Sequence, residues 1–243
     1  MTQKTHRSDG TAAARTAQYL TPALFDFLRE LKGNNNREWF DANRQRYEDD
    51  VRGPVLRFIT DVAPKLRAVS THIVADPSRV GGSMFRINRD TRFSRNAEPY
   101  STAVKVAFRH DAVGRHMPGP GCFLQIGPDD VMAAGGLYGA DAAMLDRVRH
   151  AIADDGARWR RITGNPRLAP MIEDRGPLLK NPPRGFAADH PLIDDLRRRT
   201  FVWYTTFSLD DACSLGFMAQ YVAACKAASP FSGFLASALG VEW

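Results

Sequence analysis

Cys122-Phe-Leu-Gln-Ile-Gly-Pro-Asp-Asp-Val-Met-Ala-Ala134 is the stretch that decides the fold. Two short apolar runs flank the turn-rich residues 127–130, and this pattern predicts two antiparallel strands joined as a hairpin. Residues 85–87 and 104–108 alternate apolar and polar side chains, and residues 201–207 form the clearest further strand. Because such alternation is typical of a sheet with one covered face, we expect an antiparallel sheet.

Helical patterns lie on both sides of these strands. Residues 21–70 carry apolar side chains at helical spacing and predict three helices, the second capped by Asn35 and the third kinked or divided at Pro64. Residues 141–163 return to helical spacing, and two C-terminal helices follow, the last opening at Ser229-Pro230. We therefore expect an α+β fold, with a mainly antiparallel sheet packed by N-terminal and C-terminal helices.

The composition is that of an ordinary globular protein with a basic charge balance. The 243 residues are 44% hydrophobic and 25% charged, and the formal charge of +6 favours anionic partners. The apolar runs fall short of the ~20 residues of a membrane span, and no secretory signal is evident, so a cytoplasmic protein without a membrane partner is expected. Residues 1–18 read as a disordered tail, and residues 19–243 as a single α+β domain.

An arginine segment, residues 86–95, is the first candidate site. Its four arginines are three residues apart and cannot share one face of a regular strand. A strand that ends in a turn after residue 88 would place Arg89 and Arg92 at the mouth of the sheet, where guanidinium groups bind phosphate or carboxylate. The alternative is that the arginines pair with acids inside the fold, which we expect of Arg86 in particular. The other candidate ligand-binding residues of this region are Asp90, Ser94 and Tyr100.

A glycine element between a strand and a helix is the second candidate. Gly135 and Gly136 would let a backbone approach a ligand, Tyr138 follows them, and the next helix offers free amide donors for phosphate. The alternative is that the glycines mark a bulge or close packing while Asp141 caps the helix.

The proline-rich loop at residues 180–191 is the third candidate. Lys180, Arg184 and His190 could face an anion there or act as acid and base. The alternative is that the loop is a rigid surface segment anchored by Phe186. The following run, residues 197–199, contains three arginines and is expected to be a solvated face.

The search for catalytic and metal motifs is negative. The six histidines are scattered, the paired carboxylates are sequence neighbours that diverge on a helix, and no nucleophile elbow is present. Three widely spaced cysteines predict buried free thiols. No catalytic residue, metal or cofactor is therefore assigned, and whether the chain is an enzyme stays open.

Several of these segments resemble a known family. The run Ser83-Met-Phe-Arg-Ile-Asn-Arg-Asp-Thr-Arg-Phe-Ser94, followed by Pro99-Tyr100, is similar to the arginine motif of the domain-of-unknown-function 2461 family. Further similar pieces are Phe27-Leu-Arg-Glu-Leu31, Asn35-Asn-Arg-Glu-Trp-Phe40, Gly135-Gly-Leu-Tyr138, Pro183-Arg-Gly-Phe186 and Asp189-His-Pro191. Ala140 departs from the family's proline. The resemblance covers roughly residues 22–226 and implies one bacterial-type domain, without any catalytic residue to carry over.

Three functional hypotheses follow from these features. The first is a cytoplasmic protein that binds an anionic, phosphate- or carboxylate-bearing small molecule through the arginine segment. The second is a nucleic-acid-binding module, in which Phe85, Phe93 and Tyr100 would stack on bases beside the basic side chains. The third is a scaffold or partner-binding protein whose arginines form salt bridges.

Overall fold

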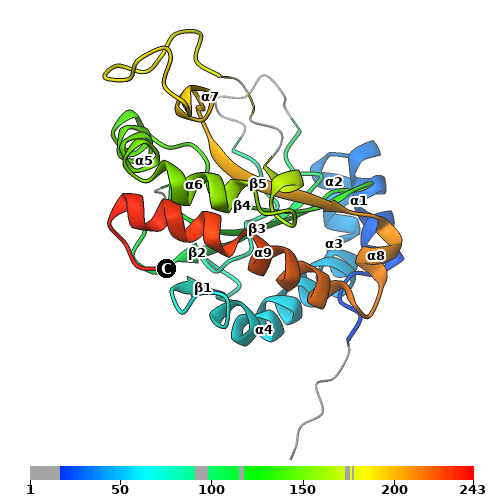
Figure 1. Cartoon of the computed structure of the whole chain (residues 1–243). Helices are drawn as coiled ribbons and strands as arrows, with labels where there is room; N and C mark the ends of the chain where they lie inside the picture. The colour runs from blue at the N-terminus through cyan, green and yellow to red at the C-terminus, as the bar shows by residue number, and fades with distance from the viewer. Residues whose placement is uncertain (1–16, 91–97, 115–117, 173–175, 177) are drawn as a thin grey trace, which may run out of the picture.

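The computed structural model describes residues 17–90, 98–114, 118–172, 176 and 178–243 (Figure 1). The predicted tail therefore lies almost wholly outside the described residues. Within them, five strands form one antiparallel sheet in chain order, namely β1 (Ile73–Val74), β2 (Val104–His110), β3 (Gly121–Ile126), β4 (Val131–Leu137) and β5 (Phe201–Phe207). With helices before and after the strands, this sheet confirms the expected α+β class.

The predicted hairpin is β3–β4. Its turn is closed by a hydrogen bond from the Gly127 amide to the Asp130 carbonyl at 2.8 Å, and Ile126 pairs with Val131. A short extended segment, residues 83–85, lies beside β2, where the Phe85 amide donates to the Lys105 carbonyl at 2.9 Å. The chain before the arginine segment therefore follows the edge of the sheet.

The first part of the described chain, residues 22–67, is helical, as expected. It contains α1 (Pro22–Gly33), α2 (Arg37–Ala42), α3 (Arg44–Arg46), the π-helical η1 (Tyr47–Arg52) and α4 (Gly53–Arg67). The expected cap of the second helix is wrong by one residue, because the side chain of Asn36 accepts from the Trp39 amide at 2.9 Å. Pro64 does not divide α4, since the fully buried Val62 and Leu66 keep the last turn packed on both sides of it.

The remaining helices are α5 (Ala142–Asp154), α6 (Gly156–Thr163), η2 (Ala169–Met171), α7 (Ile193–Leu196), α8 (Leu209–Cys213) and α9 (Phe217–Leu239). The expected break at Pro230 is wrong, because α9 continues through this residue with Ala228 and Phe231 fully buried beside it. By length and composition α9 could cross a membrane, which is weak evidence because a buried core helix meets the same criterion.

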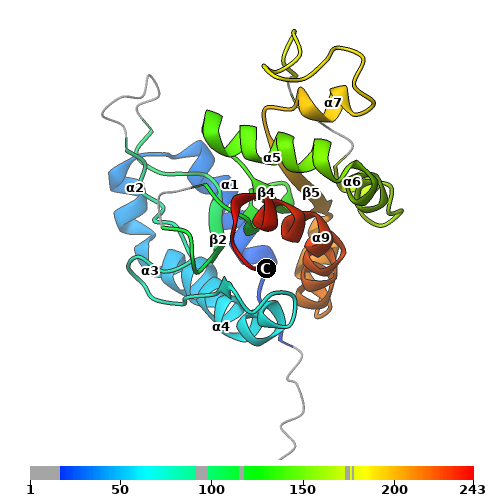
Figure 2. The same ribbon diagram turned by 60° about the vertical axis from the view of Figure 1, so that its left-hand side comes forward.

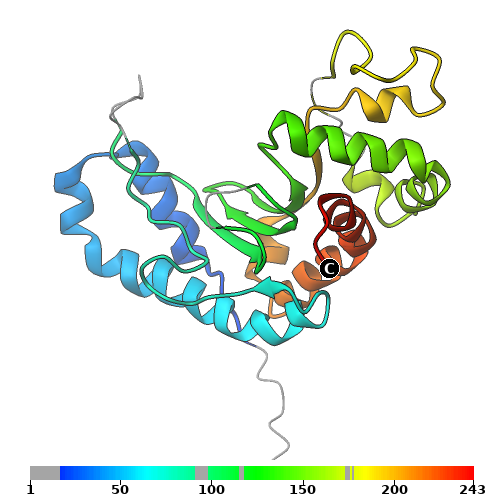
Figure 3. The ribbon, with the colours of Figure 1, turned by 90° about the vertical axis from the view of Figure 1, so that its left-hand side faces the viewer.

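One face of the sheet packs on helices. Figure 3 shows the cyan α4 and the orange-red α9 together beneath the green strands. The Phe108 ring of β2 lies 6.0 Å from the Tyr221 ring of α9, and Phe58 of α4 lies 5.6 Å from the same ring. Trp203 of β5 donates its indole hydrogen to the Ser232 hydroxyl of α9 at 3.3 Å. This inner face is the core of the protein.

Candidate functional site

The opposite, outer face of the sheet carries three cross-strand rows of side chains. The central row runs across four strands and alternates small with large residues: Ala107, Phe123, Ala134 and Tyr204. The row toward one end of the strands is Lys105, Gln125, Met132 and Thr206. Toward the other end, Arg109 pairs with Gly121, and Gly136 pairs with Val202. Except for Gly136 and Thr206, each of these positions has a buried inner-face residue next to it along its strand.

Two glycines leave parts of the outer face without side chains, so that the backbone itself forms the surface there. A Cβ atom on Gly121 would come within 2.6 Å of the Phe108 carbonyl oxygen. Gly136 has a φ of +98°, and a Cβ atom there would lie 2.3 Å from the Phe201 carbonyl oxygen. Because the backbone excludes side chains at both positions, the sheet is hollowed between its aromatic residues.

The hollow is a groove of about 610 Å³, here named the apolar groove. It is lined by residues of the outer-face rows, by Phe85 and Tyr138, and by the loop residues Val113, Pro118, Gly119 and Pro120. Phe85 is 44% exposed and Tyr138 is 78% exposed, while Tyr204 also ranks among the exposed large hydrophobic residues. Antiparallel sheets normally turn polar side chains toward solvent, so an open apolar face of this kind indicates a binding surface.

A second groove, of about 480 Å³ and here named the basic groove, adjoins the first. Its lining residues are Phe85, Arg86, Asn88, Arg89, Ser101, Thr102, Ala103, Lys105 and Gln125. Phe85, Lys105 and Gln125 line both grooves, which makes the two continuous. The arginine segment therefore borders the outer face of the sheet.

The structure reverses the expected roles of the first two arginines. Arg89, expected as an open ligand-binding residue, donates to the Glu98 carboxylate at 3.2 Å. Arg86, expected to pair inside the fold, is exposed, and its side chain has no hydrogen bond or ion pair with any described residue. The exposed Lys105 ammonium likewise has no partner within the described chain. Arg86 and Lys105 are thus the available cations of the basic groove.

The chain continues in ladder-like pairing up to Arg89, whose amide donates to the Pro99 carbonyl at 2.8 Å. Arg92, Phe93 and Ser94 lie outside the described residues, as does Thr91, the last residue of the expected turn at residues 89–91. Asp90 is exposed, lines neither groove and takes part in an interaction within the protein. The proposed role of this part of the motif therefore stays a prediction.

Tyr100 belongs to the core, and its assignment as a ligand-binding residue loses its basis. It is 5% exposed, and its ring stacks on Phe40 with centroids 4.1 Å apart. The side-chain amide of Asn35 donates to the Tyr100 carbonyl at 3.0 Å and accepts from the Tyr100 amide at 3.1 Å. Asn35 does not cap α2. Its side chain instead holds the backbone of Tyr100, which follows the arginine segment in the chain, against the N-terminal helices.

The glycine element contributes shape to the apolar groove. A Cβ atom on Gly135 would come within 2.7 Å of the Trp203 ring, so this glycine permits close packing beneath the groove. Asp141 caps α5 by accepting from the Met144 amide at 2.8 Å. Because a carboxylate already occupies that helix end, phosphate binding there is disfavoured. Gly135, Gly136 and Tyr138 nevertheless all line the apolar groove.

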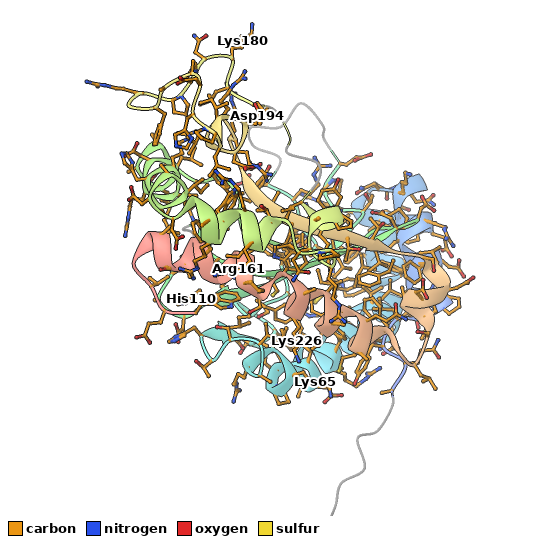
Figure 4. The ribbon with its side chains drawn as sticks, viewed as in Figure 1. Lys65, His110, Arg161, Lys180, Asp194 and Lys226 are labelled. Atoms are coloured by element: carbon orange, nitrogen blue, oxygen red, sulfur yellow. The ribbon has the colours of Figure 1, made fainter. Side chains whose placement is uncertain are left out.

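The proline-rich loop lies apart from both grooves. Figures 2 and 3 show the yellow loop beyond α5, at the opposite side from the segment that leads to the arginine motif, and Lys180 extends outward at the top of Figure 4. Arg184 is exposed and lines neither groove. The solvated face expected for residues 197–199 is wrong at Arg198, which is 2% exposed and pairs with Asp195 at 3.0 Å.

One histidine cluster in the described chain could be considered for metal binding. His72, His110 and Asp111 bring possible ligand atoms within 4.8 Å of one another. The Nδ1 atom of His110 accepts from the Ala112 amide at 3.2 Å, and its Nε2 atom bonds to the Glu242 carbonyl, so both ring nitrogens are engaged. His110, which Figure 4 places near the C-terminus, therefore fastens the end of the chain to β2.

The cysteines are poor candidates for nucleophiles. A hydrogen bond with Cys225 and burial together raise the pKa of the Cys122 thiol well above its ordinary value. Burial also raises the pKa of Cys213. Since the thiolate is the reactive form, both side chains are held as neutral thiols. Cys122 and Cys225 are buried free thiols, as expected, whereas Cys213 is half-buried.

Several groove residues were not predicted from the sequence, among them Lys105, Phe123, Met132, Ala134 and Tyr204. A signal was present, because β4 is apolar at outer as well as inner positions and β3 carries Phe123 on its outer face. A strand that is apolar on both faces needs a second covering layer or an apolar ligand. Phe123, Met132 and Tyr204, which belong to the outer-face rows, line the apolar groove.

Comparison with known proteins identifies the family of this chain. The model of the family described as conserved hypothetical protein DUF2461 matches residues 23–234. No curated protein and no solved structure matches the chain. The match spans the helices, all five strands of the described sheet and both grooves, and it confirms the resemblance carried by the arginine motif. The chain therefore belongs to the DUF2461 family.

Proposed function

We propose that this protein binds an anion-bearing small molecule in the basic groove. The observation that carries the proposal is that Arg86 and Lys105, two cations without a partner among the described residues, line one hollow. Guanidinium and ammonium groups bind phosphate and carboxylate through charge-assisted hydrogen bonds. The proposed site thus contains one fork-shaped donor and one point charge.

Neutral donors on the same walls support the proposal. Asn88 and Thr102 line the basic groove and offer an amide and a hydroxyl. The Ser101 hydroxyl is used locally, because it donates to the Ala103 carbonyl at 2.7 Å. The carboxylate of Glu98 is held by Arg89, which partly neutralises the negative charge nearest the motif. The charge balance of the basic groove therefore favours binding of an anion.

The test is a thermal-shift titration with inorganic phosphate and with acetate, each at millimolar concentration. We expect saturable stabilisation of the unmodified protein, as binding to the folded state requires. Arg86→Ala and Lys105→Ala should each weaken it about tenfold while leaving the ligand-free melting temperature nearly unchanged.

Arg184→Ala is the matched control, because it removes an exposed arginine that lines neither groove. Equal losses in Arg184→Ala and Arg86→Ala would reduce the effect to overall charge and contradict the proposal. A loss of ligand-free stability in Arg86→Ala would instead support the scaffold hypothesis. Tight oligonucleotide binding that falls steeply with salt, without any response to phosphate or acetate, would support the nucleic-acid hypothesis.

A further inference from the structure

We infer that the ligand is amphipathic: a carboxylate or phosphate joined to a flat apolar body, with the anion at the β2 edge and the body across β3–β5. This inference rests on the proposed function, because the same Lys105 serves the anion. Its basis is the junction of the two grooves. Phe85, Lys105 and Gln125 line both, so a single molecule can occupy them together.

The apolar part of the site is built for a flat body. The central outer-face row places Ala107 and Ala134 on either side of Phe123, and Tyr204 follows at its end. Ala134, a small residue between the Phe123 and Tyr204 rings, leaves a slot in which a planar group can contact aromatic surface. Gly121 and Gly136 extend the low floor, since neither tolerates a side chain.

The charge of the outer face is confined to one edge. Lys105 and Arg109 both point outward from β2, about 13 Å apart by the rise of four strand residues. Arg109 lies over the Phe85 ring, with 5.1 Å between its guanidinium carbon and the ring centroid. The outer positions of β4 and β5 that line the groove, Met132, Ala134, Gly136, Val202 and Tyr204, carry no charge. A ligand with charge at one end only matches this distribution.

The dimensions favour a small molecule over a macromolecular partner. The apolar groove holds about 610 Å³, within the range of about 300–1,000 Å³ that is typical of small-molecule sites. Burial of the apolar body would supply affinity, while the cations would set the orientation of the bound ligand.

Isothermal titration calorimetry of the full chain tests the inference with three probes. Naphthoate carries both parts, naphthamide is its neutral counterpart, and acetate is the anion without the body. We expect naphthoate to bind at least about tenfold more tightly than either of the others. Lys105→Gln should weaken naphthoate about tenfold and leave naphthamide unchanged.

Two variants address the apolar groove directly. Ala134→Phe fills the space between Phe123 and Tyr204, and Tyr204→Ala removes one wall; each should weaken naphthoate about tenfold without changing the affinity for acetate. Thr206→Phe is the matched control, because Thr206 shares the outer face of β5 but does not line the groove. If Ala134→Phe fails to fold, the Tyr204→Ala result decides.

The outcomes separate the inference from the proposed function. If acetate binds as tightly as naphthoate and depends on Arg86 and Lys105, the proposed function stands and the inference falls. If naphthamide binds as tightly as naphthoate and the Arg86 and Lys105 variants have unchanged affinity, both the proposed function and the inference are wrong. Full naphthoate affinity in both Ala134→Phe and Tyr204→Ala would overturn the inference, as would a dimer in sedimentation velocity that Tyr204→Ala dissociates.

Discussion

The two faces of the sheet differ in what covers them, although the same strands supply both. Inner-face residues such as Phe108 and Trp203 are fully buried against the helices. Their outer-face neighbours on the same strands, such as Arg109 and Tyr204, line a groove. One residue along a strand therefore separates a position that stabilises the fold from a position available to a ligand. The comparison teaches that stability and binding can be altered independently in this protein.

The largest effect is expected from the inner face, at Trp203→Ala. Trp203 is fully buried, and its ring packs against the backbone of Gly135. The lost packing and the cavity left behind should lower the free energy of unfolding by about 3–5 kcal/mol. Urea denaturation followed by circular dichroism measures this, and a loss under about 1 kcal/mol would break the distinction between the faces.

An intermediate effect is expected at Gly136, where the groove floor meets the backbone of β5. Gly136→Ala places a side chain at positive φ and against the Phe201 carbonyl oxygen. Strain of this kind should cost about 2 kcal/mol in the free energy of unfolding. Gly139→Ala is the matched control for the space, since that glycine also has positive φ but nothing lies within 4 Å of its Cβ position. A smaller loss in Gly139→Ala than in Gly136→Ala, by the same denaturation assay, would confirm the close approach.

The smallest effect on stability is expected at Tyr204→Ala, one residue along the chain from Trp203. Tyr204 is 36% exposed on the outer face, so its removal should change the free energy of unfolding by under about 1 kcal/mol. The same variant should lose about tenfold in naphthoate affinity. A stability loss comparable to that of Trp203→Ala would show that the two faces are not energetically distinct.

Much of the fold was predictable from local signals. Alternation and the 127–130 turn predicted the β3–β4 hairpin, and helical spacing predicted the helices on both sides. The errors fall at prolines and caps. Pro230 was expected to begin a helix, yet α9 continues through it because the residues around it are buried. Tertiary packing there outweighs the lost hydrogen bond and the crowding by the proline ring, about 3 kcal/mol.

The candidate site was predictable only in outline. The arginine segment stands out by its unusual spacing and borders the basic groove, and its role as a binding site stays a prediction. The roles of its members were reversed, since Glu98 arrives nine residues later in the chain to pair with Arg89. The role of Lys105 could not be predicted, because a single lysine at an exposed position of an alternating strand does not indicate a site until its neighbours in the fold are known.

The sequence by itself determined the antiparallel hairpin, the flanking helices and the family, because turn chemistry and side-chain periodicity act between residues close in the chain. Only the tertiary structure decided that Ala107, Phe123, Ala134 and Tyr204 form one row, since strand register joins residues up to 97 positions apart through long-range pairing. It likewise decided which cations stay unpaired within the described chain, because ion pairing depends on which acid the folded backbone brings into reach.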